Sequence, residues 1–128
     1  MPVSSTASNK REPARVRVCP AAELKPGERR IVSYHGREAG VFNVDGAYHA
    51  LANRCPHNGA PLCLGWVRPL ITCDQERAVT VHTDVSILRC PWHQWEFDLR
   101  TGHSNVDPRF SAKSYRVETD GDNVLVYI

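Results

Sequence analysis

Residues 55–62 read Cys-Pro-His-Asn-Gly-Ala-Pro-Leu, and residues 90–98 read Cys-Pro-Trp-His-Gln-Trp-Glu-Phe-Asp. Each stretch separates a thiol from an imidazole by one or two residues, and a proline directly follows each cysteine. Proline fixes φ and removes a backbone donor, which suits a short, stiff loop. The two stretches therefore predict two similar loops that present metal ligands, and these loops organise the rest of the chain.

The candidate ligands are Cys55, His57, Cys90 and His93. Two cysteines and two histidines can bind zinc or an iron–sulfur cluster. Familiar zinc sites pair like with like, as C-x₂₋₄-C followed by H-x₃₋₅-H, whereas each loop here offers one cysteine and one histidine. Two facing loops of equal shape would place both sulfurs on one iron and both rings on the other. The mixed loops favour a two-iron cluster, with a single zinc ion as the alternative.

C-x-H followed by C-x-x-H resembles the ligand pattern of Rieske proteins. The two loops also resemble those of Rieske ferredoxins and of the N-terminal domains of ring-hydroxylating oxygenases. The resemblance covers most of residues 14–128 and implies one [2Fe–2S] cluster on the four candidate ligands. Two features depart from the family pattern. Gln94 stands where a glycine usually follows the histidine, and 32 residues separate His57 from Cys90, with the excess near residues 66–88.

The flanking sequence predicts an all-β fold of short strands and regular turns, because no window of ten or more residues shows a helical period. The expected strands are residues 15–18, 30–34, 38–44, 48–51, 114–118 and 123–128, with turns at His35-Gly36, Asp45-Gly46 and Asp120-Gly121. Within the insertion, residues 78–82 and 85–89 suggest a further hairpin that turns at Thr83-Asp84. Together with the resemblance, this implies a Rieske-like antiparallel β-sandwich with an inserted cluster-binding subdomain at about residues 52–110.

The length and charge of the chain limit the number of domains and the kinds of partner. A chain of 128 residues forms one domain. We expect that domain over residues 14–128, after a disordered polar tail over residues 1–13. Lys plus Arg is 16 and Asp plus Glu is 14, so no concentrated basic charge indicates nucleic-acid binding. No apolar run is long enough to span a membrane or form a signal peptide, which predicts a cytoplasmic protein without a membrane partner.

The family resemblance also bears on the redox potential. High-potential Rieske proteins carry an additional cysteine in each loop, and these form a disulfide. They also carry a Ser and a Tyr that donate hydrogen bonds to sulfur. The matching positions here are Ala60 and Trp92 for the disulfide, and Trp95 and Phe97 for the hydroxyls. The resemblance therefore implies a potential at the low end of the Rieske range.

Three other cysteines and one loop have weaker assignments. Cys63 could be a redox-active thiol or a small packing residue, and packing is the favoured interpretation. Cys19 and Cys73 receive no function. Residues 106–109 resemble the proline-containing third loop that shields the cluster in this family, although an ordinary Asp-Pro turn explains them equally well.

The leading functional hypothesis is a one-electron ferredoxin component that receives an electron from a reductase and passes it to a terminal oxygenase. The chain has no dinucleotide fingerprint and no second metal site, so we expect no catalytic residues and no complete reaction on an organic substrate. A second hypothesis is an accessory subunit of a nitrite reductase or an oxygenase. A third, from another class, is a redox sensor or a zinc-stabilised binding module.

Overall fold

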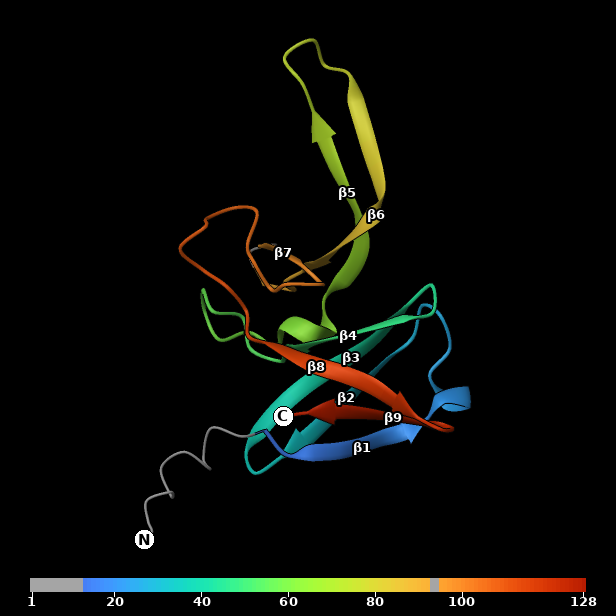
Figure 1. Cartoon of the computed structure of the whole chain (residues 1–128). Coiled ribbons are helices and arrows are strands. Elements are labelled where there is room, and N and C mark those ends of the chain that lie inside the picture. The colour runs from blue at the N-terminus through green and yellow to red at the C-terminus, as the bar shows by residue number, and fades with distance from the viewer. Residues whose placement is uncertain (1–12, 93–94) are drawn as a thin grey trace, which may run out of the picture.

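The computed structural model describes residues 13–92 and 95–128, and this part of the chain forms two antiparallel β-sheets (Figure 1). The predicted disordered tail therefore lies outside the described residues, apart from Pro13. Two short 3-10 turns accompany the strands. The elements are β1 Arg15–Pro20, η1 Ala21–Glu23, β2 Arg29–Tyr34, β3 Arg37–Val44, β4 Ala47–Ala52, η2 Leu62–Leu64, β5 Trp66–Cys73, β6 Val79–Arg89, β7 Glu96–Asp98, β8 Ser114–Asp120 and β9 Asn123–Tyr127.

The base of the molecule is a six-stranded sheet in the order β1-β9-β8-β4-β3-β2. Its tight turns follow from residues that tolerate positive φ. Asp45 and Gly46 have φ values of 52° and 93°, so the predicted turn between β3 and β4 is confirmed. The last hairpin turns one residue later than predicted. Asp120 pairs with Asn123, and Gly121, with φ at 60°, begins the turn.

Two hydrophobic clusters lie on opposite sides of β3 and β4. Val41 and Ala50 belong to a cluster inside the base, whereas their neighbours Phe42 and Leu51 belong to a second cluster beneath the smaller sheet. Five consecutive residues of β3, Ala39 to Asn43, are buried for this reason, and the strand shows no alternation between apolar and polar positions. The second cluster also contains Cys55 and Cys90, so the same core supports both loops.

The smaller sheet has the order β5-β6-β7. β5 and β6 form a long hairpin that projects from the body (Figure 1), and we call residues 66–89 the arm. An extra hairpin in the insertion was predicted, but its predicted strands were wrong. Residues 79–89 form one strand paired with β5, and Thr83-Asp84 lies in the irregular stretch of β6 rather than at the turn.

The turn of the arm is built by Asp74. Its Oδ1 accepts the backbone N–H groups of Glu76 at 2.8 Å and Ala78 at 2.9 Å, while Arg77 takes a φ of 66°. An Asx-type turn of this kind needs no glycine, which explains why no glycine marks the tip. The all-β, two-sheet prediction is otherwise confirmed. In the described part of the chain, no helix is long and apolar enough to cross a membrane.

Candidate metal centre

The first cysteine loop, residues 55–60, follows β4 and closes on itself. The Cys55 N–H donates to the Ala60 carbonyl at 2.8 Å, and the Gly59 N–H donates to the Cys55 carbonyl at 2.8 Å. Gly59 has φ at 80°, which its lack of a Cβ permits. The side chain of Asn58 accepts the Ala60 N–H through Oδ1 at 3.0 Å. These bonds fix a tight turn with the Cys55 thiol on its buried side.

The second cysteine loop begins at Cys90, directly after β6. The Cys90 N–H donates to the Trp95 carbonyl at 2.7 Å. Each loop is therefore closed by the same bond, from the cysteine N–H to the carbonyl five residues later. The similarity of the two sequence stretches corresponds to a similarity of backbone structure. His93 and Gln94 lie outside the described residues, so the predicted fourth ligand and the Gly-to-Gln departure cannot be placed.

The two loops bring Cys55 and Cys90 together. Both residues are fully buried, and burial raises the pKa of Cys90 to about 11. The backbone N–H of Trp92, which donates to Cys90, lowers that pKa, and the neighbouring thiol of Cys55 raises it. Two adjoining buried thiols are a suitable donor pair for iron or zinc, because metal binding replaces their protons.

His57 is exposed at the other side of the first loop, where aromatic rings hold it. Its ring stacks on Trp95 with centroids 4.1 Å apart and planes 13° apart. Phe110 contacts Trp95 edge-on at 5.2 Å. The first loop thus packs against the second through His57 and Trp95, and Phe110 brings the segment after Asp107-Pro108 to the same place. Sequence reasoning missed Phe110, although it directly follows the predicted third loop.

The donor chemistry fits a Rieske cluster as far as the described residues reach. The thiol pair would supply the cysteine half of the predicted ligand set, and Asn58 Nδ2 is a buried donor without an acceptor in the described part of the chain. The described residues include no group of three or more His, Cys, Asp and Glu side chains that could hold a metal ion. His57 lies against Trp95 in this arrangement, so the histidine half is not assembled from the described residues alone.

A polar network around Glu96 joins three segments near the second loop. The Glu96 carboxylate is paired with Arg68 at the base of the arm, and it lies 3.9 Å from Nε of Arg89. Asn105 Nδ2 donates to the same carboxylate at 3.0 Å. The network ties the arm and β7 to Asn105, directly before the third loop, and the sequence carried no local signal for it.

The remaining cysteines separate into packing and surface residues. Burial raises the pKa of the Cys63 thiol to about 12, and the thiol donates to the Leu51 carbonyl at 3.3 Å. A Cβ on Gly40 would lie 2.5 Å from the Cys63 Cβ, so β3 needs glycine there. This supports the interpretation of Cys63 as a packing residue. Cys19 is buried in the base, Cys73 is exposed on the arm, and all five cysteines are free thiols.

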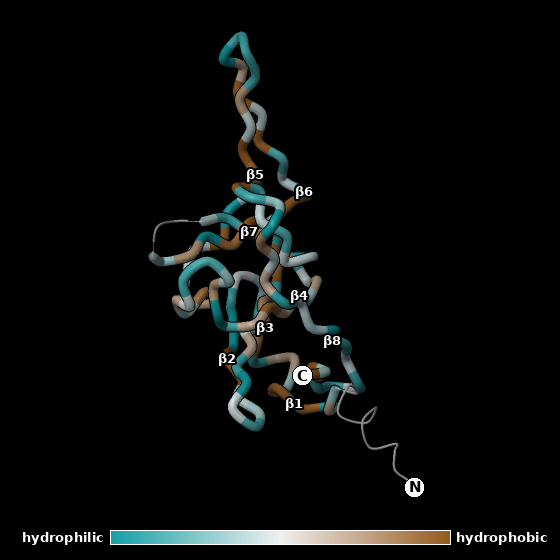
Figure 2. The backbone as a smooth tube through the Cα atoms, turned by 90° about the vertical axis from the view of Figure 1, so that its left-hand side faces the viewer, coloured by the Kyte–Doolittle hydropathy of each residue, from teal (hydrophilic) through white to brown (hydrophobic). Residues whose placement is uncertain are grey.

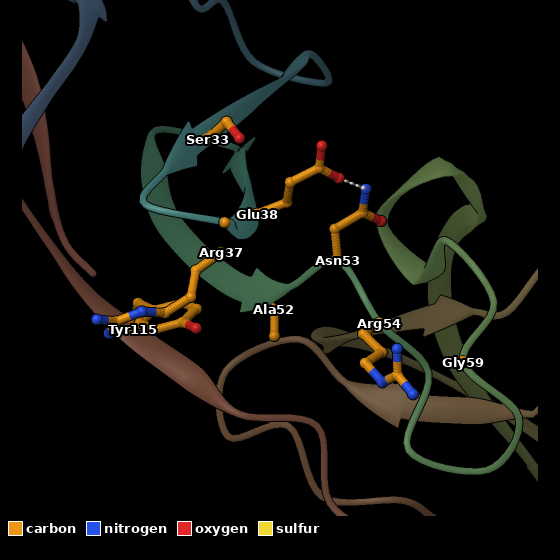
Figure 3. Close-up of a pocket in the computed structure, with 9 residues that line it drawn as sticks. Ser33, Arg37, Glu38, Ala52, Asn53, Arg54, Gly59 and Tyr115 are labelled. Carbon is orange, nitrogen blue, oxygen red and sulfur yellow. Dashed lines mark hydrogen bonds between the residues drawn. The ribbon is translucent and has the colours of Figure 1, made fainter.

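A pocket of about 460 Å³ lies beside the first loop (Figure 3). Its two arginines do not converge: Arg37 lies along Tyr115, whereas Arg54 turns toward Gly59. Glu38, which accepts a hydrogen bond from Asn53 at 3.1 Å, adds a negative charge. The pocket therefore lacks the convergent polar groups of a small-molecule site.

A β-sheet base that carries two similarly closed cysteine loops, with their buried thiols side by side, is the arrangement expected of a small metal-binding domain. The family profile of the Rieske [2Fe-2S] domain matches residues 14–119. The chain therefore belongs to the Rieske [2Fe-2S] domain family, and this membership implies a [2Fe–2S] cluster.

Individual relatives agree with this assignment. The chain is 32% identical over 108 residues to a human Rieske domain-containing protein, covering 78% of this chain but 58% of that protein's length. It is 28% identical over 111 residues to the biphenyl dioxygenase ferredoxin subunit of Pseudomonas sp. (strain KKS102), covering 86% of this chain and 88% of that one. The structure resembles the ferredoxin of carbazole 1,9a-dioxygenase from Nocardioides aromaticivorans IC177. The TM-score is 0.67 and the identity 28%, over 89% of this chain and 97% of the other.

Proposed function

We propose that this chain is a one-electron carrier whose single [2Fe–2S] cluster is held by Cys55, His57, Cys90 and His93. The observation that carries the proposal is the matched pair of loops, each closed by the same backbone bond and each placing a buried thiol against the other. When bound, the cluster supplies a one-electron couple at a higher potential than an all-cysteine cluster, because neutral imidazoles replace two thiolates.

The residues around this site would have three roles: binding the cluster, stabilising charge on sulfur, and packing around a ligand. Cys55 and Cys90 provide the buried thiolates, and the Trp92 N–H stabilises negative charge on the Cys90 sulfur. His57 provides an imidazole on the exposed side, where a partner can approach it. Trp95 and Phe110 pack around that imidazole and limit its motion.

We further propose a low potential within the Rieske range. Phe97 is fully buried in the core beneath the loops, and Trp95 packs against His57, so neither position offers a hydroxyl donor to sulfur. A reduced cluster with fewer such donors is less stable, which lowers the potential. We expect a midpoint between about −150 and 0 mV.

The partners we propose are a reductase that donates the electron and a terminal oxygenase that accepts it. Support comes from the two ferredoxins described above, whose names place them in a biphenyl and a carbazole dioxygenase system. The chain covers nearly the full length of each. The free thiols also suit a reducing compartment, so we place the carrier in the cytoplasm.

Metal and sulfide analysis of the purified protein, with an EPR spectrum after reduction, tests the proposal. We expect about two irons and two acid-labile sulfides per chain and a Rieske-type signal. Cys55→Ser and Cys90→Ser should each abolish the cluster, whereas Cys63→Ser is the matched control that should retain it. A folded, colourless protein with one zinc would overturn the proposal and favour the zinc-stabilised module.

The proposed potential and partners need their own measurements. Trp95→Ser combined with Phe97→Tyr should raise the midpoint in protein-film voltammetry, because both changes add hydroxyl donors near sulfur. A wild-type midpoint well above zero would contradict the low-potential proposal. A carrier should exchange electrons with a separate reductase and leave the complex, whereas permanent co-purification with a larger enzyme would favour the accessory-subunit hypothesis.

A further inference from the structure

The outer part of the arm is a two-stranded hairpin, and one of its faces is apolar and exposed in the described part of the chain. β5 lies at the edge of its sheet, and β7 pairs with β6 only over Ile87 to Arg89. The outer part of the arm therefore has no third strand among the described residues. Figure 2 shows it standing away from the body, with hydrophobic stretches below a hydrophilic tip. An isolated two-stranded hairpin is at best marginally stable in water, so this length of arm calls for a covering surface.

The pairing register separates the two faces of the arm. Ile71 pairs with Val81 and Cys73 with Val79, and alternation along β5 places Pro69 on the same face. At the root, Val67 pairs with the fully buried Leu88, so the exposed face begins at Pro69. We call this face the apolar strip. Its members are all exposed, and they are Pro69, Ile71, Cys73, Val79 and Val81.

Exposure along the strip is high for residues of this kind. Ile71 is 48% exposed, Val81 52% and Val79 64%. The opposite face of the outer arm is mostly polar: Thr72 and His82 share a hydrogen bond of 2.9 Å, Thr80 pairs with Thr72, and Leu70 is the apolar residue beside them. Scattered apolar residues on a surface need no explanation, but a continuous strip on one face of an amphipathic arm indicates an interaction surface.

We propose that the apolar strip is a homodimer interface, in which the arms of two copies of this chain pack face to face and antiparallel. The strip carries no charged residue, so it can lie against itself without burying an unpaired charge. A two-fold axis through the middle of the strip would satisfy both copies with the same residues, as isologous dimers require. The proposal concerns the arm alone and holds whether or not the proposed electron-carrier function is correct.

Charge at the two ends of the arm selects the antiparallel orientation. The turn carries Asp74, Glu76 and Arg77, a net negative charge, whereas Arg68 and Arg89 outnumber Glu96 at the root. Antiparallel packing places each acidic turn beside the other copy's basic root. Parallel packing would place the two acidic turns together and repel. The strip is small for a permanent interface, so the dimer should be weak and reversible.

Sedimentation or light scattering of the holoprotein, over about 1 to 500 μM, tests the dimer. Wild type should move from monomer to dimer over this range. Ile71→Lys combined with Val81→Lys should raise the dissociation constant at least about 100-fold, because each buried lysine charge opposes association. Thr72→Lys combined with Thr80→Lys is the matched control, with the same charge on the same strands but the opposite face, and it should dimerise like wild type.

Three results would overturn the proposal: a wild type that stays monomeric throughout, a strip variant that still dimerises, or an equal loss in the strip and control variants. A monomer whose strip variant loses binding only to a reductase or oxygenase would assign the strip to that partner instead. The visible absorption of the cluster and the far-UV CD spectrum report whether each variant is folded.

Glu76→Lys tests the orientation separately. It should weaken the antiparallel dimer, because the turn would become basic beside the basic root. Unchanged association of Glu76→Lys would instead fit parallel arms, whose paired turns carry like charges before and after the substitution, and would overturn the proposed orientation.

Discussion

The β3–β4 hairpin and the β5–β6 hairpin have the same local structure and opposite surroundings. β3 and β5 each have eight residues and pair antiparallel with the next strand. The first hairpin is buried on both faces between two hydrophobic clusters, whereas most of β5 is exposed. Apolar residues are frequent in both, so apolar content alone does not reveal which hairpin is covered. Their contribution to the free energy of unfolding should differ accordingly.

The largest expected effect comes from truncating one apolar residue in each hairpin. Leu51→Ala removes a fully buried side chain from the core beneath the loops and should cost about 2–5 kcal/mol. Ile71→Ala removes a half-exposed side chain and should cost less than about 1 kcal/mol in dilute protein. Denaturant unfolding followed by far-UV CD measures both. Equal losses would show that the arm is part of the cooperative core.

Removing the side chain that organises each turn should give a smaller difference in the free energy of unfolding. Buried Asn43 accepts the Gly46 N–H at 2.8 Å and donates to the Leu24 carbonyl at 2.8 Å. Asn43→Ala leaves these buried partners unsatisfied and should cost about 1–3 kcal/mol. Asp74 makes comparable bonds, but in solvent, so Asp74→Ala should cost less than about 1 kcal/mol, since water replaces it.

Hydrogen exchange distinguishes these two effects. Asp74→Ala should accelerate exchange only in the arm, whereas Asn43→Ala should lower protection across the base sheet. Faster exchange in the base after Asp74→Ala would contradict the separation between the two hairpins.

The cysteine on the arm and the cysteine beneath the β3–β4 hairpin should be alkylated at different rates in the wild-type protein. Cys73 is exposed on the arm, whereas Cys63 packs under β3 with a pKa raised to about 12. In dilute, monomeric protein at pH 8 iodoacetamide should alkylate Cys73, and Cys63 should react at least about 100-fold more slowly, because a raised pKa leaves little thiolate. Peptide mass spectrometry after timed quenching measures both rates. Comparable rates would place Cys63 in a mobile, accessible position.

Local sequence signals predicted the base of the molecule well. Asp45-Gly46 identifies its turn because both residues adopt positive φ, and the flanking strands follow from residue type alone. The arm was harder, because its turn depends on the Asp74 side chain rather than on glycine. Thr83-Asp84 resembles a turn locally. In the structure, β6 pairs with β5 on both sides of these residues, so they form an irregularity within one strand. Long-range pairing decided between these alternatives, and no short window contains that information.

In the candidate site, too, local sequence predicted some features, whereas others depend on contacts between distant segments. The two cysteines were identifiable because each carries its proline and histidine within a few residues. The stack of His57 on Trp95, its contact with Phe110, and the pairing of Glu96 with Arg68 join segments far apart in the chain. These contacts arise only when the loops pack together, so residue spacing could not predict them.

Trp66 pairs with Arg89 where the chain enters and leaves the arm, directly before Cys90. Trp66 and Arg89 are therefore held one strand spacing apart, whatever the length of the arm between them. Closing a longer loop costs little extra free energy, about 0.6 kcal/mol for each doubling of its length. The arm can accordingly be lengthened, shortened or replaced over evolution without moving the cysteine loops, so recognition by the arm and chemistry at the loops are free to diversify independently.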